Sequence, residues 1–128
     1  MIPPIRQKFN QLLNFDDDEH NQDWHLIFAD ETRLDEFIQC YQQYAIDEHE
    51  KSLMMELIVA SFDLYFWEEN QDLVMWARIE ALLQSEHPLF AYIINYWCLW
   101  DVTESREQHP DYFFNITFLM RELSQTLQ

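Results

Sequence analysis

The sequence contains no glycine among its 128 residues. Loops that cradle phosphates need glycine where the backbone approaches the ligand, and so does the sharp turn that exposes a nucleophilic serine in α/β-hydrolases. Tight β-hairpin turns also favour glycine, because their central residues have positive φ angles. The absence of glycine therefore argues against P-loop, Rossmann and α/β-hydrolase folds, and against hairpin-rich all-β folds.

Positive charge is also scarce. Seven Lys and Arg residues face 24 Asp and Glu residues, which gives a formal net charge of −17. Such a charge opposes folding through self-repulsion, but it keeps a protein soluble and steers it toward cationic partners. It would repel nucleic-acid phosphates and anionic lipid head groups. We therefore expect no direct binding to nucleic acid and none to a membrane.

Cysteines and long apolar runs are few. Cys40 and Cys98 each lie in an apolar stretch, which predicts two buried, reduced thiols, although the sequence leaves open whether they pair. The most apolar run, residues 89–100, is too short to span a bilayer, and the segment Met1–Pro4 does not begin a signal peptide. These features predict a soluble, cytoplasmic protein.

Apolar residues recur at helical spacing along most of the chain. They make up 48% of the sequence, which is enough to build the core of one domain. We predict an all-α protein of about six helices, stacked as antiparallel helical hairpins in a single domain over residues 1–128, because short connectors favour antiparallel neighbours. One further helical turn is expected at 24–28. The six helices are expected at about 4–14, 34–45, 52–68, 73–87, 88–100 and 110–127.

Four details of these helices can be predicted. Thr32 is expected to cap the second helix, with Asp35 as its capping-box partner. Residues 47–50 are expected to form a polar connector. Asn70 is expected to adopt the left-handed conformation after the third helix. The helix at 88–100 has almost no polar face, so it is expected to lie at the centre of the protein.

Carboxylates are concentrated between positions 16 and 50. This segment holds 12 acidic residues and one basic residue, a net charge of −11. One interpretation is a solvated surface, and the other is an electrostatic docking face for a basic protein. The second interpretation assigns partner binding to Asp16, Asp17, Asp18, Glu19 and Asp23.

A second acidic segment follows the third expected helix. Glu68, Glu69 and Asp72 either complement the dipole of the next helix or form another contact with a basic partner. Trp24 and Trp67 stand beside the two acidic segments. Each is either a core residue or an exposed anchor ringed by carboxylates, and tryptophan is favoured at the centre of protein interfaces.

No motif for metal binding or catalysis stands out. Neither Glu-x-x-His nor His-Glu-x-x-His occurs. His49 and His87 have acidic neighbours, but five histidines among 24 carboxylates produce such adjacencies by chance. We therefore expect no enzymatic activity, no catalytic residue, no metal and no cofactor.

Three segments of the C-terminal half carry a family resemblance: residues 76–83, the pair Tyr96-Trp97 followed by Asp101, and residues 112–121. They resemble small all-helical immunity proteins of bacterial polymorphic toxin systems, in particular those of contact-dependent growth inhibition. The resemblance implies a cytoplasmic protein that binds one cognate toxin domain and blocks it. Many such toxins are nucleases, whose active faces are basic because their substrate is polyanionic.

The composition and the resemblance thus lead to the same expectation about the partner's charge. An acidic immunity protein would occlude the active or substrate-binding face of a basic toxin nuclease by charge complementarity. The alternative from another class is an acidic mimic of nucleic acid, for example phage-encoded, that inhibits a DNA- or RNA-binding protein. A mimic would need rows of carboxylates spaced like phosphates.

Overall fold

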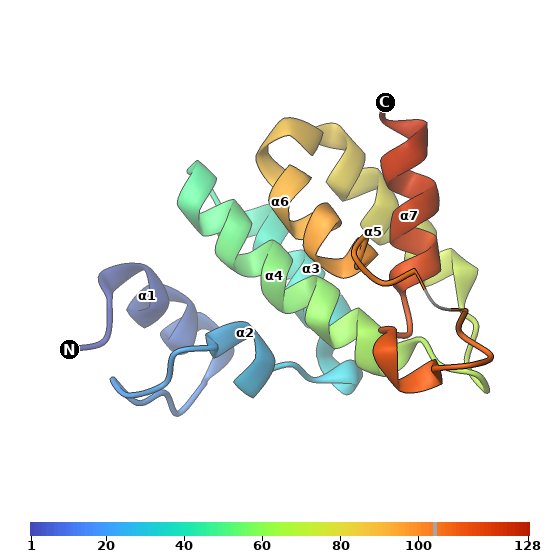
Figure 1. Ribbon diagram of the computed structural model, residues 1–128. Helices are drawn as coiled ribbons and strands as arrows, with labels where there is room; N and C mark the ends of the chain where they lie inside the picture. Colours follow the sequence, from blue (N-terminus) through green and yellow to red (C-terminus); the bar gives the residue numbers. More distant parts are fainter. Residues whose placement is uncertain (104) are drawn as a thin grey trace. The chain divides into compact units, whose positions relative to one another are not determined.

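The computed structural model describes residues 1–103 and 105–128 (Figure 1). No β-strand occurs in these residues, so the predicted all-α fold class is confirmed. The six predicted helices correspond to α1 and α3 to α7, and the helical turn expected at 24–28 is α2. The elements in chain order are α1 (Pro4–Leu13), α2 (Trp24–Ile27), the 3₁₀ helix η1 (Glu31–Arg33), α3 (Leu34–Tyr44), α4 (Glu48–Tyr65), α5 (Leu73–Ser85), α6 (His87–Cys98), the 3₁₀ helix η2 (Pro110–Tyr112) and α7 (Thr117–Thr126).

The chain divides into two compact units, Met1–Ser61 and Phe62–Gln128. Helix α4 contributes to both, because residues 48–61 belong to the first unit and residues 62–65 to the second. The expectation of a single domain built of stacked hairpins remains a prediction. Within the described residues, no helix combines the length and the apolar composition needed to cross a membrane.

The first unit is built around aromatic side chains. Phe15 stacks on Phe28 with ring centroids 4.4 Å apart, and it meets the rings of Trp24 and Phe37 edge-on. Helix α1 is followed by Asn14 in the left-handed conformation, which asparagine adopts more easily than most residues. The turn directs the chain back toward the cluster at Phe15.

The start of α3 differs from the prediction. Asp30, not Thr32, provides the cap, since its Oδ1 accepts hydrogen bonds from the Thr32 amide at 2.9 Å and from the Thr32 hydroxyl at 2.6 Å. The capped element is η1, which leads directly into α3. The predicted cap at Thr32 is wrong because its hydroxyl acts as a donor to the neighbouring carboxylate.

Helix α4 begins where a polar connector was predicted. The Glu50 amide donates to Asp47 Oδ1 at 2.8 Å, and Glu50 Oε1 accepts from the amides of Ile46 and Asp47. This reciprocal pairing is a capping box, which starts a helix with polar residues alone. The prediction of a connector at 47–50 is therefore wrong, because it relied on the first apolar residue to mark the helix start.

Helix α4 ends at Tyr65, and Asn70 does not take the predicted left-handed conformation. In the part of the chain that is described, positive φ angles occur at Asn14 and Leu99. Asn70 instead donates from its side-chain amide to the Tyr65 carbonyl at 2.8 Å. Asp72 then caps α5 by accepting from the amides of Val74 and Met75.

Helix α6 is not central, contrary to the prediction. Tyr92 and Tyr96 are 52% and 53% exposed, whereas one face is buried. The buried residues of that face recur at helical spacing: Phe90, Ile93, Ile94, Trp97 and Cys98. The prediction was wrong because it counted tyrosine as fully apolar, while the phenol can lie at a surface.

Helix α7 lies beside α6 in the second unit (Figure 1). It begins at Thr117, so the last helix does not start at Pro110 as predicted; the proline opens the short helix η2 instead. Ile116, Met120 and Leu123 are buried, whereas Phe118 is 41% exposed.

Candidate partner-binding surface

Negative charge is present on both units. The first unit holds 13 acidic and four basic residues, a net charge of −9, and the second holds 11 acidic and three basic residues, a net charge of −8. Neither unit is therefore net positive, so the charge of one does not offset the charge of the other. Each unit on its own would attract a cationic surface.

Arg6, Lys8 and Arg33 in the first unit are engaged in contacts inside it. Arg6 donates to the Asp17 carboxylate, and Lys8 donates to Glu50 Oε2 at 2.6 Å and to the Tyr44 carbonyl. Arg33 pairs with Glu36 and also donates to the Leu13 carbonyl at 2.6 Å. These cations hold helices and loops together, so they do little to offset the exposed carboxylates.

In the second unit, Arg121 is used in the same way. Its guanidinium donates to the carbonyl of Cys98, the last residue of α6, and to the carbonyls of Leu99 and Val102 just after it. It also lies 5.2 Å from the ring centroid of Trp100. Arg121 thus provides hydrogen-bond donors for carbonyls at the helix end that lack intrahelical partners, so its role is structural.

Asp17 is the structural centre of the acidic loop at 15–23. Its side chain is 1% exposed and accepts hydrogen bonds from Arg6 Nε and Nη2 at 2.8 to 3.0 Å. The side chains of Asn10 and Asn21 donate to it as well. Burial opposes ionisation, but these hydrogen bonds outweigh it and lower the pKa of Asp17. Asp17 therefore fixes the loop and offers no free carboxylate to a partner.

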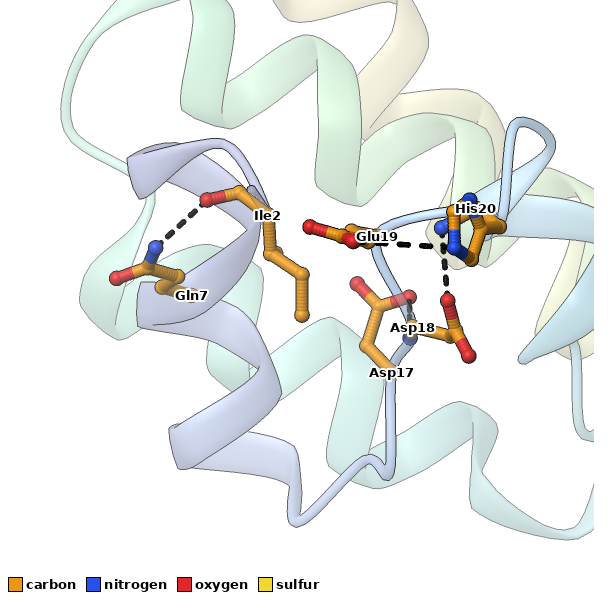
Figure 2. Close-up of a pocket in the computed structure, with 6 residues that line it drawn as sticks. All are labelled: Ile2, Gln7, Asp17, Asp18, Glu19 and His20. Atoms are coloured by element: carbon orange, nitrogen blue, oxygen red, sulfur yellow. Dashed lines mark hydrogen bonds and ion pairs between the residues drawn. The ribbon is translucent and has the colours of Figure 1, made fainter.

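The loop borders an open hollow of about 520 Å³ (Figure 2). Asp18, Glu19 and His20 line it together with two residues from the N-terminal segment, Ile2 and Gln7. Glu19 is half exposed and lies 2.6 Å from the N-terminal ammonium and 3.8 Å from His20 Nε2. The charge of Glu19 is thus partly offset by its own surroundings.

The remaining predicted residues of this loop differ in availability. Asp16, Asp18 and Asp23 are exposed. Trp24 is 2% exposed and donates from Nε1 to Asn10 Oδ1 at 2.7 Å, so it belongs to the core and cannot offer its ring to a partner. Three of the six residues predicted in the first unit, Asp16, Asp18 and Asp23, are therefore exposed aspartates. One oxygen of Asp18 accepts from the His20 amide.

The second predicted group lies in the turn between α4 and α5. Trp67 is 45% exposed, and Glu68 and Glu69 are exposed beside it. Asp72 has a structural role, because its carboxylate caps α5 and accepts from the Tyr65 hydroxyl at 2.8 Å. The amides of Met75 and Val74 and the Tyr65 hydroxyl together lower the pKa of Asp72.

A hollow of about 480 Å³ adjoins this turn. It is lined by Trp67, Glu68 and Gln71 from the turn, and by Arg106 and Asn115 from the segment between α6 and α7. The lining combines an aromatic ring, side-chain amides, a carboxylate and the guanidinium of Arg106. The ring and the carboxylate can attract a basic side chain from a partner, whereas Arg106 opposes it.

Asp63 is a notable residue that the sequence analysis missed. Its Oδ1 accepts from the Ile116 amide at 3.1 Å, and its carbonyl accepts from the Asn115 side chain at 2.7 Å. Burial raises the pKa of this carboxyl to about 6, although the amides and Arg106 lower it in part. The available signal was an aspartate between the apolar residues Phe62 and Leu64 in a helix that is mostly buried.

Two further features bear on chemistry. Cys40 and Cys98 are free and buried, and burial raises the pKa of each thiol to about 11. Such thiols are poor nucleophiles, because the thiolate is the reactive form. Across residues 1–103 and 105–128, no three side chains among His, Cys, Asp and Glu gather into a group that could hold a metal ion.

Comparison with protein-family models, with curated proteins and with solved structures finds no match for this chain. The inference of function therefore depends on the charge and exposure of its own residues.

Proposed function

We propose that this protein is a cytoplasmic immunity protein that binds and neutralises a cognate bacterial toxin domain. The expected toxin is a basic nuclease whose active or substrate-binding face is occluded in the complex. One observation carries the proposal: exposed carboxylates remain on both units, while Arg6, Lys8, Arg33 and Arg121 are engaged in internal contacts.

The physical reason is the balance between folding and binding. Self-repulsion among carboxylates opposes folding, so a surface this negative is favoured where a partner neutralises it. Charge complementarity speeds association and disfavours wrong partners. A nuclease is a suitable partner because the surface that binds its polyanionic substrate attracts an acidic protein equally.

The first experiment tests the partner. The chain is co-expressed with the product of the adjacent reading frame, and the two are purified through a tag on this chain. We expect a stable complex whose affinity weakens as the salt concentration rises. We also expect expression of the neighbour alone to inhibit growth, and co-expression of this chain to restore it. A neighbour that does not bind, or that inhibits growth equally with and without this chain, would refute the proposal.

A second experiment tests the acidic loop. Reversal of Asp16, Asp18 and Asp23 to Lys should weaken the complex more than reversal of three exposed carboxylates elsewhere, Glu107, Asp111 and Glu122. Both triple variants change the net charge equally. An equal loss of affinity would show that only total charge matters, and an unchanged affinity in both would exclude an electrostatic interface.

The alternative of a nucleic-acid mimic receives less support. Mimicry needs exposed carboxylates in regular rows, whereas Asp17, Glu50 and Asp72 are used in an ion pair and in helix caps. Neutralisation of a cationic protein surface requires only a local excess of negative charge. We therefore favour the immunity protein.

A further inference from the structure

Large apolar side chains are exposed where α4 passes into α5. Leu64 is 50% exposed, Trp67 is 45%, Leu73 is 58% and Val74 is 76%. All four lie within one short stretch of the second unit. Scattered exposed apolar residues are ordinary, whereas several in one short segment are a candidate for a surface that contacts a partner.

The turn that presents these side chains is held by several hydrogen bonds. The Trp67 carbonyl accepts from the Asn70 amide at 2.8 Å and from the Gln71 side chain at 2.6 Å. Asn70 donates to the end of α4, and Asp72 caps the start of α5. A turn fixed in this way loses little backbone entropy on binding, so the backbone that carries the exposed indole is pre-organised.

The chemistry of the partner follows from what flanks the apolar residues. Glu68 and Glu69 are exposed next to Trp67, and the hollow beside the indole is also lined by the amides of Gln71 and Asn115 and by Arg106. Two carboxylates thus stand beside the indole against one guanidinium. An indole face beside carboxylates attracts lysine and arginine. The complementary surface is thus apolar at its centre and cationic at its rim.

We infer that the surface formed by Leu64, Trp67, Glu68, Glu69, Leu73 and Val74, here called the Trp67 surface, docks a protein segment in which Lys or Arg residues flank apolar side chains. The indole of Trp67 is the central contact, and the glutamates pair with the cations. The inference rests on the proposed function in one respect, that the partner is a cationic protein. The exposed Tyr92 and Tyr96 on α6 are the competing surface.

The first test needs no knowledge of the toxin. The full ¹⁵N-labelled chain is titrated with a synthetic amphipathic peptide of leucine and arginine, and with a matched peptide in which serine replaces leucine. We expect the leucine–arginine peptide to shift the amide signals of residues 64–74 most, and to bind at least several-fold more tightly than the serine–arginine peptide. Equal binding of the two peptides would overturn the inference, as would no binding or the largest shifts on α6 or on the loop at 15–23.

The second test uses matched tryptophan variants. Trp100 is 44% exposed in the same unit, so Trp100→Ala removes a ring of similar exposure to that lost in Trp67→Ala. Loss of an anchor residue typically lowers affinity by a factor of about 30. We expect this loss of affinity for the leucine–arginine peptide in Trp67→Ala and not in Trp100→Ala. The unfolding midpoint of each variant identifies any loss that arises from misfolding, and Trp67→Phe, which keeps an aromatic ring, should retain most of the affinity.

The two proposals can fail separately. If the toxin complex forms and Trp67→Ala binds it like the parent, the Trp67 surface is overturned while the immunity function stands. If no toxin binds but the leucine–arginine peptide still selects residues 64–74, the immunity function is overturned and the docking surface stands.

Discussion

Replacing Asp63 by asparagine is expected to stabilise the protein above about pH 6 and to change its stability little near pH 4. Burial raises the pKa of Asp63 from 3.8 to about 6. The folded state therefore binds this proton more tightly than the unfolded state does. The resulting stability is fully present below the unfolded pKa and is lost as the pH rises toward 6.

The magnitude follows from the shift. About two pKa units correspond to about 3 kcal/mol, and partial exposure of the site reduces this to about 1–2 kcal/mol. Asparagine keeps an oxygen that can accept from the Ile116 amide, so the hydrogen bond at 3.1 Å need not be lost. The variant removes the buried charge while retaining the contact.

The assay is urea unfolding of the parent and of Asp63→Asn at several pH values between about 4 and 8. The difference in the free energy of unfolding should grow in favour of the variant between about pH 4 and 6 and then level off. Asp17→Asn is the matched control, because Arg6, Asn10 and Asn21 lower the pKa of Asp17 against the effect of burial. It should destabilise the protein at neutral pH, and the loss should shrink as the pH falls into the acid range.

Two outcomes would refute this reasoning. If Asp63→Asn destabilises the protein equally at about pH 4.5 and 7.5, the ionised carboxylate makes no net unfavourable contribution. If the variant is destabilised only at neutral pH, attraction from Arg106 and the amides outweighs burial, and the folded pKa of Asp63 lies below its ordinary value of 3.8.

Three further predictions concern caps, thiols and the end of α6. Asp47→Ala should lower the free energy of unfolding in urea by about 1 kcal/mol, because it removes the cap of α4. Glu48→Ala, at the exposed neighbour, should lower it less, and equal losses would contradict the capping box. Cys40 and Cys98 should react with a thiol reagent only on unfolding, and rapid labelling of the folded chain at about pH 8 would contradict their burial. Arg121→Gln should lower the thermal midpoint by several degrees, because the carbonyls at the end of α6 and just after it lose a charged donor; an unchanged midpoint would show that water replaces the guanidinium.

The helices could be predicted from the spacing of apolar residues, since burial of one face decides where a helix forms. The boundaries could not, because they depend on polar hydrogen bonds. Asp47 and Glu50 start α4 through a reciprocal cap, although the same residues read as a charged connector. Asn70 was identified as a helix-ending residue, but it acts through its side chain rather than its backbone conformation.

The candidate site was less predictable than the fold. Asp16, Asp17 and Asp18 are identical in type and adjacent in sequence, yet only Asp17 faces Arg6 and becomes buried. Trp24 and Trp67 both stand next to acidic residues, but Trp24 bonds Asn10, 14 positions upstream, and lies in the core. Such pairings depend on how separate helices pack, and sequence-local patterns do not contain that information.

The distribution of cations links the fold to the proposed function. In the first unit, Arg6, Lys8 and Arg33 each join a carboxylate to a backbone carbonyl of a distant segment, so each serves two structural contacts at once. Few basic residues therefore suffice to hold a unit whose net charge is −9. Added salt screens the repulsion that remains, which stabilises the free protein, but it also screens attraction to a cationic partner. Under the proposed function, salt should thus raise the stability of the free protein and lower its affinity for the partner. If the surface served folding alone, additional lysines would stabilise the protein, so the scarcity of lysine fits a surface that is kept negative for binding.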